Sequence, residues 1–274
     1  MTTIVHLSDI HFGGWADIRQ LEAVEAQLPD LAPTATIVSG DHSQRARAGE
    51  LQRARAFFRS AAALAPVHVV PGNHDVQWWR EPLGIPLLGA ARYRKYRRYI
   101  SEELGPSLSV DGAVICGTVS AHGLHPGSLT WNLRDLTVKG HLPGSEIDRA
   151  ERAFGSAPVG TARVLVIHHN VLKGRLSRRW GLAHPQAALD GIARCGADVV
   201  CCGHDHEEGI GTIERAGRRV VVSTAGTLST RSRGKRASSF NVVRIGPDRI
   251  RVEIHRFDAA KERFCLAEGE DFAR

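Results

Sequence analysis

The sequence predicts an α/β fold built on a parallel β-sheet, and three observations support this prediction. Apolar runs of strand length alternate with longer runs that carry apolar residues at helical spacing. Asp9, Asp41 and Asn73, which each follow such a strand, are 32 residues apart twice, close to the roughly 30 residues of one strand-helix-strand unit. At 274 residues the chain can bury a large core, and we expect one domain over residues 1–274.

Five stretches are predicted to end a strand in polar side chains of the kinds that bind metals. The stretch Val69–Asp75 shows the design. Its valines predict a buried strand, Pro71 stops further ladder pairing, and Gly72 lets the chain turn so that Asn73 and His74 project past the sheet edge. The five stretches are residues 2–11, 35–42, 69–75, 163–169 and 197–206.

The first two connections are predicted to be helices packed on the sheet. The first helix covers Trp15 to Leu28 and is expected to end at Pro29, and the second lies within Gln44 to Leu64. The 95 residues between Asn73 and His168 exceed one crossover and must hold extra elements. These are a helix over 90–104, a hairpin over 108–121 that turns at Asp111-Gly112, and a helix over 145–154 opened by a capping box of Ser145 and Asp148.

The last part of the chain changes character. A helix is predicted over Pro185 to Cys195, with Gly196 as its C-cap. From Thr212 to Phe257, strand-like runs alternate with turn signals, which predicts mostly antiparallel strands, followed by a short tail over 258–274.

Composition limits the classes of function. With 36 Lys and Arg against 29 Asp and Glu the net charge is +7, which suits an anionic substrate or a nucleic acid but also fits a plain basic surface. The five cysteines show no metal or redox spacing, as in a protein with reduced thiols. Strand residues begin at Thr2, and no apolar run approaches the roughly 18 residues of a membrane span, so we expect a cytoplasmic protein.

The polar groups at the strand ends predict a metal centre. Carboxyl ends of strands in an open α/β sheet face one crevice, so these side chains can converge there. Each pair alone is more often incidental than a ligand, but all five clusters stand where unpaired polar groups would be costly. Seven donors exceed what one ion takes, which predicts two metals, and imidazole, carboxylate and amide donors favour manganese, iron or zinc. The donors are Asp9, His11, Asp41, Asn73, His168, His204 and His206.

These blocks, in this order, resemble the signature of the calcineurin-like metallophosphoesterase superfamily. They read Asp9-Ile-His11, Gly40-Asp41, Gly72-Asn73-His74-Asp75, His168-His169 and Gly203-His204-Asp205-His206. The context over residues 40–46, with the runs at 223–227 and 239–241, further resembles the bacterial branch related to class III cyclic-nucleotide phosphodiesterases.

The resemblance implies a four-layer α/β/β/α sandwich and a role for each matching residue. One metal would be held by Asp9, His11 and His206, the other by Asn73, His168 and His204, and Asp41 would bridge them. A hydroxide held by the metals would attack phosphorus in line. His74 would bind a phosphate oxygen and protonate the leaving group.

The chain departs from the family pattern near the site. His42 follows the bridging aspartate, where relatives often have an apolar residue; it could bind metal, bind substrate or point away, and pointing away is favoured. His169 is expected to support the site and not to bind metal. Gln44 stands where some relatives pair the catalytic histidine with an aspartate, and Asn170 replaces a proline.

Basic and aromatic residues predict a substrate rim. They occur at Trp78 and Trp79, in the run Lys173 to Trp180, and in the run Arg231 to Arg236. Each run alone is more often a solvated loop. The residues proposed to contact substrate are His42, Trp78, His169, Arg175 and Arg231.

Three functions follow. The first is a dinuclear-metal phosphodiesterase acting on small phosphodiesters such as cyclic nucleotides, without membrane partners and compatible with a homo-oligomer. The second is a nuclease or phosphomonoesterase; the charge of +7 favours a nuclease, although no long basic stripe is present. The third is a binding module that has lost catalysis, against which the complete ligand set argues.

Overall fold

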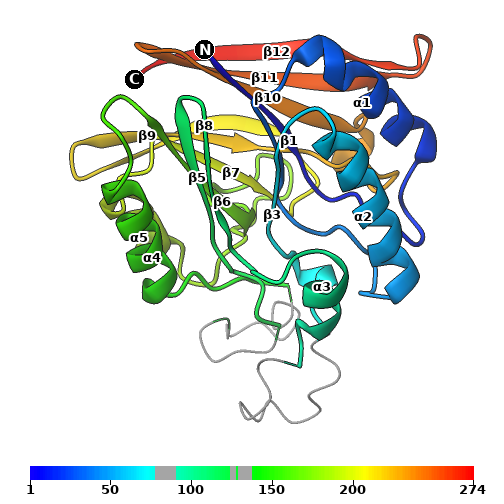
Figure 1. Ribbon diagram of the computed structural model, residues 1–274, viewed down its shortest axis with the longest axis horizontal. Helices are drawn as coiled ribbons and strands as arrows, with labels where there is room; N and C mark the ends of the chain where they lie inside the picture. The colour runs from blue at the N-terminus through cyan, green and yellow to red at the C-terminus, as the bar shows by residue number, and fades with distance from the viewer. Residues whose placement is uncertain (78–90, 124–127, 129–137) are drawn as a thin grey trace.

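The structure is a computed structural model that describes residues 1–77, 91–123, 128 and 138–274. In this part of the chain, two six-stranded sheets face each other (Figure 1). The first has the order β12-β11-β10-β1-β2-β3 and the second β4-β5-β6-β7-β9-β8. The first contains β1 (Thr2–Leu7), β2 (Ala35–Val38), β3 (Val67–Val69), β10 (Ser239–Ile245), β11 (Arg249–Asp258) and β12 (Arg263–Ala273). The second contains β4 (Ser107–Val110), β5 (Ala113–Gly117), β6 (Ala162–His169), β7 (Val199–Gly203), β8 (Gly209–Arg215) and β9 (Arg218–Thr224).

Helices cover the two outer faces of this pair of sheets. On the first sheet lie α1 (Ile18–Leu31) and α2 (Ala48–Ala62), and on the second lie α4 (Gly144–Gly155) and α5 (Pro185–Arg194), as Figure 1 shows. The short α3 (Arg94–Tyr99) lies against α2. The predicted four-layer α/β/β/α sandwich is therefore confirmed. Within the described ranges, no helix has the length and apolar character needed to cross a lipid bilayer.

The alternation of side chains along each strand explains why the sheets are buried on both faces. On β1, Ile4 faces the second sheet while Val5 faces α1 and α2. On β6, Val164 packs between the sheets and Leu165 packs against α4 and α5. Continuous apolar strands of this kind need cover on both faces, and the paired sheets with their outer helices provide it.

The ligand-bearing strands are shared between the sheets. β1, β2 and β3 pair in parallel in the first sheet, as the 32-residue spacing predicted. β6 and β7 pair in parallel in the second sheet, so the 95-residue interval carries the chain from one sheet to the other. The carboxyl ends of all five strands nevertheless meet at one end of the sandwich.

Several predicted elements have different bounds in the structure. Pro29 lies in the last turn of α1 and does not end the helix. Two more helical residues follow it, and the helix ends at the C-cap Ala32, which has φ 45°. The predicted capping box is wrong, since α4 begins at Gly144 with Pro143 as its N-cap, and Ser145 lies inside the first turn. Among the described residues of the predicted helix 90–104, only Arg94–Tyr99 are α-helical.

The end of the chain is a strand and not the predicted tail. β12 pairs along its whole length with β11 and forms the edge of the first sheet. The predicted antiparallel region is also divided, because β8 and β9 join the second sheet while β10 and β11 join the first. Turn signals in the sequence marked the hairpins, but which sheet each hairpin joins depends on long-range pairing.

The buried carboxylate of Asp75 ties the loop after β3 to the loop after β2. Its Oδ1 accepts hydrogen bonds from the backbone N–H of Ser43 at 2.9 Å and from the Ser43 hydroxyl at 2.7 Å. Its Oδ2 accepts from the backbone N–H groups of His42 at 3.1 Å and Gly72 at 3.0 Å. Asp75 thus satisfies four buried donors and fixes how two ligand-bearing loops lie against each other.

We predict that Asp75→Asn lowers the free energy of unfolding by roughly 2–4 kcal/mol, because an amide NH₂ then faces buried N–H donors that lose their acceptor. Urea denaturation followed by circular dichroism measures the loss. Asp30→Asn, at an exposed position on α1, is the matched control and should change stability by less than about 0.5 kcal/mol. Equal stabilities of the two variants would contradict this role of Asp75.

Candidate metal centre

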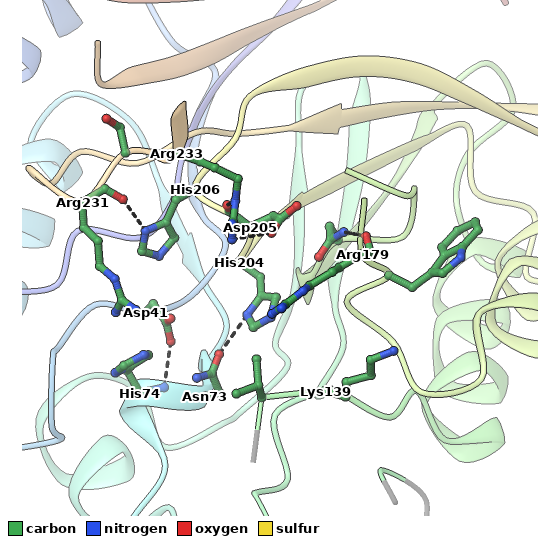
Figure 2. A pocket seen from close by; sticks show the side chains of 14 residues that line it. Asp41, Asn73, His74, Lys139, Arg179, His204, Asp205, His206, Arg231 and Arg233 are labelled. Atoms are coloured by element: carbon green, nitrogen blue, oxygen red, sulfur yellow. Dashed lines mark hydrogen bonds and ion pairs between the residues drawn. The ribbon is translucent and has the colours of Figure 1, made fainter. Parts of the chain in front are cut away.

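A cleft of about 370 Å³ lies where the carboxyl ends of strands from both sheets meet (Figure 2). Its lining includes Asp41 from the first sheet and His204 and His206 from the second. Ligands of α/β proteins gather at this kind of strand end, and the size is that of a small-molecule site. The cleft is therefore the candidate functional site.

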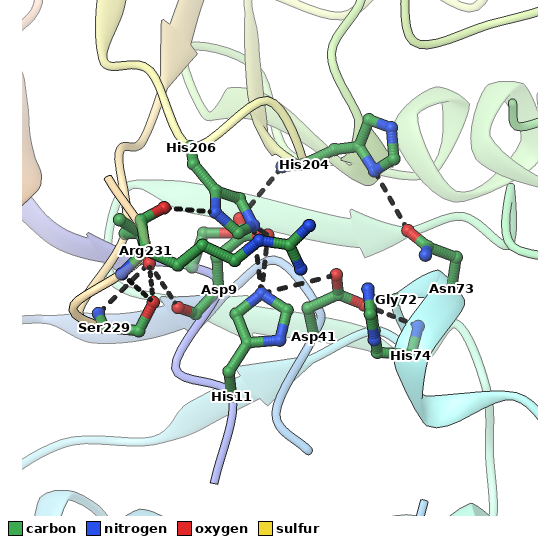
Figure 3. A network of polar contacts seen from close by, with 12 residues as sticks. Asp9, His11, Asp41, Gly72, Asn73, His74, His204, His206, Ser229 and Arg231 are labelled. Atoms are coloured by element: carbon green, nitrogen blue, oxygen red, sulfur yellow. Dashed lines mark hydrogen bonds and ion pairs between the residues drawn. The ribbon is translucent and has the colours of Figure 1, made fainter. Parts of the chain in front are cut away.

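The first group of candidate ligands joins the end of β1 to the loop after β7 (Figure 3). The Nε2 atoms of His11 and His206 are 3.0 Å apart. Oδ1 of Asp9 is 3.2 Å from Nε2 of His206 and 3.7 Å from Nε2 of His11. Together with Asp41, these side chains offer four ligand-type atoms within 4.8 Å of one another.

The second group joins the end of β3 to the ends of β6 and β7. Oδ1 of Asn73 is 3.1 Å from Nε2 of His168 and 3.0 Å from Nδ1 of His204. The two imidazole nitrogens are themselves 3.3 Å apart. An amide oxygen and two imidazoles therefore point at one small volume.

The Asp41 carboxylate faces both groups. Its Oδ2 lies 3.8 Å from Nε2 of His11 in the first group and 3.5 Å from Nε2 of His168 in the second. Its Oδ1 accepts a hydrogen bond of 2.8 Å from the backbone N–H of His74. One carboxylate oxygen is thus held by the backbone while the other stands between the two groups.

Backbone carbonyls orient two of the imidazoles. Nδ1 of His168 is 2.8 Å from the carbonyl oxygen of Ser39, and Nδ1 of His206 is 2.6 Å from that of Arg231. A carbonyl only accepts, so each Nδ1 carries a proton, and Nε2 is the nitrogen that offers a lone pair when the imidazole is neutral. These lone pairs point into the groups, which is how histidine ligands of metals are usually prepared.

The electrostatics of the site keep its carboxylates ionised. Burial would raise the pKa values of Asp9 and Asp41, but the surrounding histidines hold both well below the usual range. Burial would lower the pKa of His168, but Asp41 and Asp9 outweigh it and raise that pKa to about 9. Burial, reinforced by the charge of His168, lowers the pKa of His204 to about 3. The two buried carboxylates thus require positive charge beside them.

The donors present fit metal ions. Oδ1 of Asp9 is fully buried and receives no hydrogen bond, an arrangement that is costly unless a cation lies beside it. Imidazole nitrogens 3.0 to 3.3 Å apart also suit a shared positive ion better than each other. The set of carboxylate, imidazole and amide oxygen with no thiolate is typical of manganese, iron and zinc sites.

The backbone at the site adopts conformations that non-glycine residues rarely take. Such left-handed residues cost of order 1–3 kcal/mol each and gather at functional sites. Five of the seven candidate ligands have positive φ: Asp9 (54°), His11 (55°), Asp41 (52°), His204 (75°) and His206 (53°).

Two glycines make room for these ligands. Gly40 has φ +103°, and a Cβ there would lie 2.5 Å from Nδ1 of His168. A Cβ on Gly72 would collide with the backbone and carboxylate of Asp41. Side chains at either position would displace candidate ligands, so both glycines are needed for close approach.

His74 lines the cleft beside the two groups. Its Nδ1 is 2.9 Å from the backbone carbonyl oxygen of Gln44, so Nδ1 donates this hydrogen bond and Nε2 can contact a ligand in the cleft. The side chain of Gln44 lies farther away, with Nε2 at 3.4 Å from the same nitrogen. In this chain a backbone carbonyl thus orients His74, the role that the family pattern gives to an aspartate in some relatives.

Two other predicted histidines take no part in the cleft lining. His42 is buried between Phe58 and Tyr96, with ring centroids at 5.0 and 5.9 Å. His169 uses both ring nitrogens, Nδ1 with the Ser120 hydroxyl at 2.8 Å and Nε2 with the Val138 carbonyl at 3.0 Å. His169 therefore has no lone pair to offer, although its ring centroid is 4.4 Å from that of His204.

The predicted rim is only partly brought together. Arg231 lines the cleft, and its guanidinium lies 6.0 Å from the ring centroid of Trp15. Arg175 lines a separate, smaller hollow between the loop at 172–175 and β8. Trp78 lies outside the described residues.

Sequence reasoning did not single out two arginines that line the cleft, Arg179 and Arg233. Arg233 forms an ion pair of 2.9 Å with Asp205, and its backbone N–H donates to the carbonyl of His206 at 3.0 Å. Both arginines stand in basic runs that the sequence marked as rims. The run signalled the surface, but only tertiary contacts select the residue that faces the cleft.

Comparisons with known proteins give one family. The family described as calcineurin-like phosphoesterase matches residues 2–208 of the chain. No curated protein matches the sequence.

Solved structures resemble this one at low sequence identity. A purple acid phosphatase from yellow lupin (Lupinus luteus) seeds has a TM-score of 0.73 at 10% identity, over 100% of this chain and 54% of the phosphatase. The chain thus spans about half the length of that protein. A protein described as a predicted phosphoesterase from Streptococcus pneumoniae has a TM-score of 0.47 at 12% identity, covering 100% of this chain and 98% of the other. Vps29 from Entamoeba histolytica, as a D62A mutant, has 0.47 at 13%, covering 99% of both.

Proposed function

The chain belongs to the calcineurin-like phosphoesterase family, and from this premise we propose that it is a dinuclear-metal-dependent phosphodiesterase acting on small phosphodiesters, cyclic nucleotides among them. The membership confirms the resemblance to the metallophosphoesterase superfamily predicted from the sequence. The observation that carries the proposal is the Asp41 carboxylate, whose Oδ2 lies 3.8 Å from Nε2 of His11 and 3.5 Å from Nε2 of His168.

In this proposal the two groups of side chains each hold one metal ion. Asp9, His11 and His206 would hold the first, Asn73, His168 and His204 would hold the second, and Asp41 would bridge them. Two metal ions, when bound, supply a water of lowered pKa as nucleophile and neutralise the phosphoryl oxygens. The distances within each group and the buried, unsatisfied Oδ1 of Asp9 support the assignment.

His74 is the proposed general acid. Its Nδ1 is engaged by the Gln44 carbonyl, so Nε2 is the atom that holds the proton for the leaving oxygen. Its backbone N–H bond to Asp41 fixes the ring beside the metal site. The same nitrogen can bind a phosphate oxygen before transfer.

Rival functions make different demands on the cleft. A nuclease needs a path for a polymer and a cationic track along it, whereas this cleft of about 370 Å³ suits a small molecule. A binding module would not need five ligands held in left-handed conformations, since a scaffold gains nothing from that strain. A phosphomonoesterase remains the nearest rival, and the resemblance of residues 40–46 to a diesterase branch favours diesters.

Metal analysis of the purified protein and a panel of phosphate esters test the proposal. We expect two manganese, iron or zinc ions per chain and a higher kcat/KM for diesters than for matched monoesters. A preference for monoesters by tenfold or more, about 1.4 kcal/mol, would overturn the diesterase assignment. Best turnover of single-stranded DNA or RNA would favour the nuclease instead.

Asp41→Asn should lower kcat more than the same substitution at Asp9, because a bridging carboxylate supports both ions and a terminal one supports a single ion. We expect a loss greater than the roughly 10–100-fold seen when only a partner of a ligand is changed. Metal content and kcat measured on both variants give the comparison. Two retained metals and a near wild-type rate in Asp41→Asn would contradict the dinuclear assignment.

His74→Ala should retain both metals and lose about 10²–10⁴-fold in turnover of esters with alkyl or ribosyl leaving groups, because those alkoxides need a proton. With nitrophenolate-type leaving groups the loss should be much smaller. Plots of log kcat/KM against leaving-group pKa should have a steeper negative slope for the variant. Parallel plots would reduce His74 to phosphate binding, and a lost metal would make it a ligand.

A further inference from the structure

Arg179 places a positive charge in the cleft that no carboxylate neutralises among the residues that the structure describes. Figure 2 shows its side chain pointing from the loop after β6 toward His204. Arg231 points into the cleft from the opposite side, near Asp41 and His74. The two guanidinium groups therefore flank the candidate metal centre.

The loop that carries Arg179 is firmly attached to the ligand-bearing loop after β7. The backbone carbonyl of Arg179 accepts a hydrogen bond of 3.0 Å from the N–H of Gly174, and this bond closes the turn. The buried carboxylate of Glu207 accepts from the N–H groups of Leu176 at 2.7 Å and Ser177 at 3.2 Å. The Ser177 hydroxyl also donates to the carboxylate of Asp205.

These attachments set Arg179 apart from an ordinary surface arginine. Asp205 and Glu207 are neighbours of His204 and His206 in the chain, so the loop is positioned directly on the segment that carries two candidate ligands. Trp180 follows Arg179, lines the same cleft and packs on the core beneath α4 and α5. An indole and a guanidinium from consecutive residues thus both line the cleft.

The other two arginines of the cleft are engaged elsewhere, since Arg231 lies over the ring of Trp15 on the opposite side of the metal centre. Arg233 is paired with Asp205 at 2.9 Å. Asp41 belongs to the proposed metal site, where the two ions would neutralise the reacting phosphate. Arg179, on the His204 side, is therefore available for an anion other than that phosphate.

We propose that Arg179 binds a second phosphoryl group of the substrate, so that the preferred substrate is a small phosphodiester carrying another phosphate. This inference rests on the proposed function and narrows its substrate class. The planar guanidinium fork suits the bidentate geometry of a phosphate. The flat indole of Trp180 suits the nucleoside part that would join the two phosphates. A cyclic mononucleotide has no second phosphate and would not use Arg179.

Two chromogenic substrates that differ only in a second phosphate test the proposal. They are thymidine 5′-(p-nitrophenyl phosphate) and the same ester with a 3′-phosphate. The metal-loaded wild-type protein should prefer the 3′-phosphorylated ester by about tenfold in kcat/KM, the size expected of one charge-assisted contact worth about 1.4 kcal/mol.

Arg179→Gln should abolish that preference while leaving kcat/KM for the ester without the 3′-phosphate within about threefold of the wild type. Arg175→Gln is the matched control, because it removes the same charge from the same loop but faces a separate hollow. It should keep the preference. No preference in the wild type, or equal losses in both variants, would overturn the role of Arg179.

Binding of the products separates this inference from the proposed function. Isothermal titration calorimetry should give a lower Kd for thymidine 3′,5′-bisphosphate than for thymidine 5′-phosphate, and Arg179→Gln should remove the difference. If neither ester is hydrolysed, the proposed function fails, and the Kd comparison still decides on Arg179. Equal Kd values for the two ligands in the wild type would overturn the second phosphate subsite.

Discussion

The buried carboxyl group and backbone of Asp9 join the two sheets at the site. Its Oδ2 accepts hydrogen bonds from the Ser8 hydroxyl at 2.6 Å and from the backbone N–H of His204 at 2.9 Å, so the end of β1 is attached to the loop after β7. Its carbonyl accepts from the Thr227 hydroxyl at 2.6 Å, and its N–H donates to the carbonyl of Gly40 at 3.0 Å. The two groups of candidate ligands lie close together because this residue holds segments from both sheets.

Such attachments sustain backbone conformations that would otherwise relax. Five left-handed ligands at an order of 1–3 kcal/mol each consume a large part of the usual stability of a domain. The four hydrogen bonds to Asp75 and the core between the sheets offset that cost. The same principle extends to the rim, where Asp205 and Glu207 hold the loop of Arg179. Rigidity here places donors before any ligand arrives, which is the condition for strong and selective binding.

Local sequence predicted the strands that carry the ligands and the chemistry that those ligands share. An apolar run ended by glycine and polar residues specifies a strand and a turn through interactions of near neighbours, as at Val69–Asp75. The spacing between Asp9 and Asp41 predicted the parallel pairing of β1 and β2, because it matches the length of one strand-helix-strand unit. The four-layer arrangement was predicted from the family resemblance. The strand at Arg263–Ala273 was not predicted, because it forms only through pairing with β11.

Tertiary contacts alone decided what each polar side chain faces. His168 and His169 are neighbours in the chain, yet one ring points at Asn73 while the other is fully engaged by Ser120 and Val138. Arg175 and Arg179 share one loop but line different hollows. The sequence by itself determined which residue types stand at the strand ends, because that follows from local patterns. The structure decided which of them converge, because the partners that orient them, such as Ser39 at 129 positions from His168, are brought close only by folding.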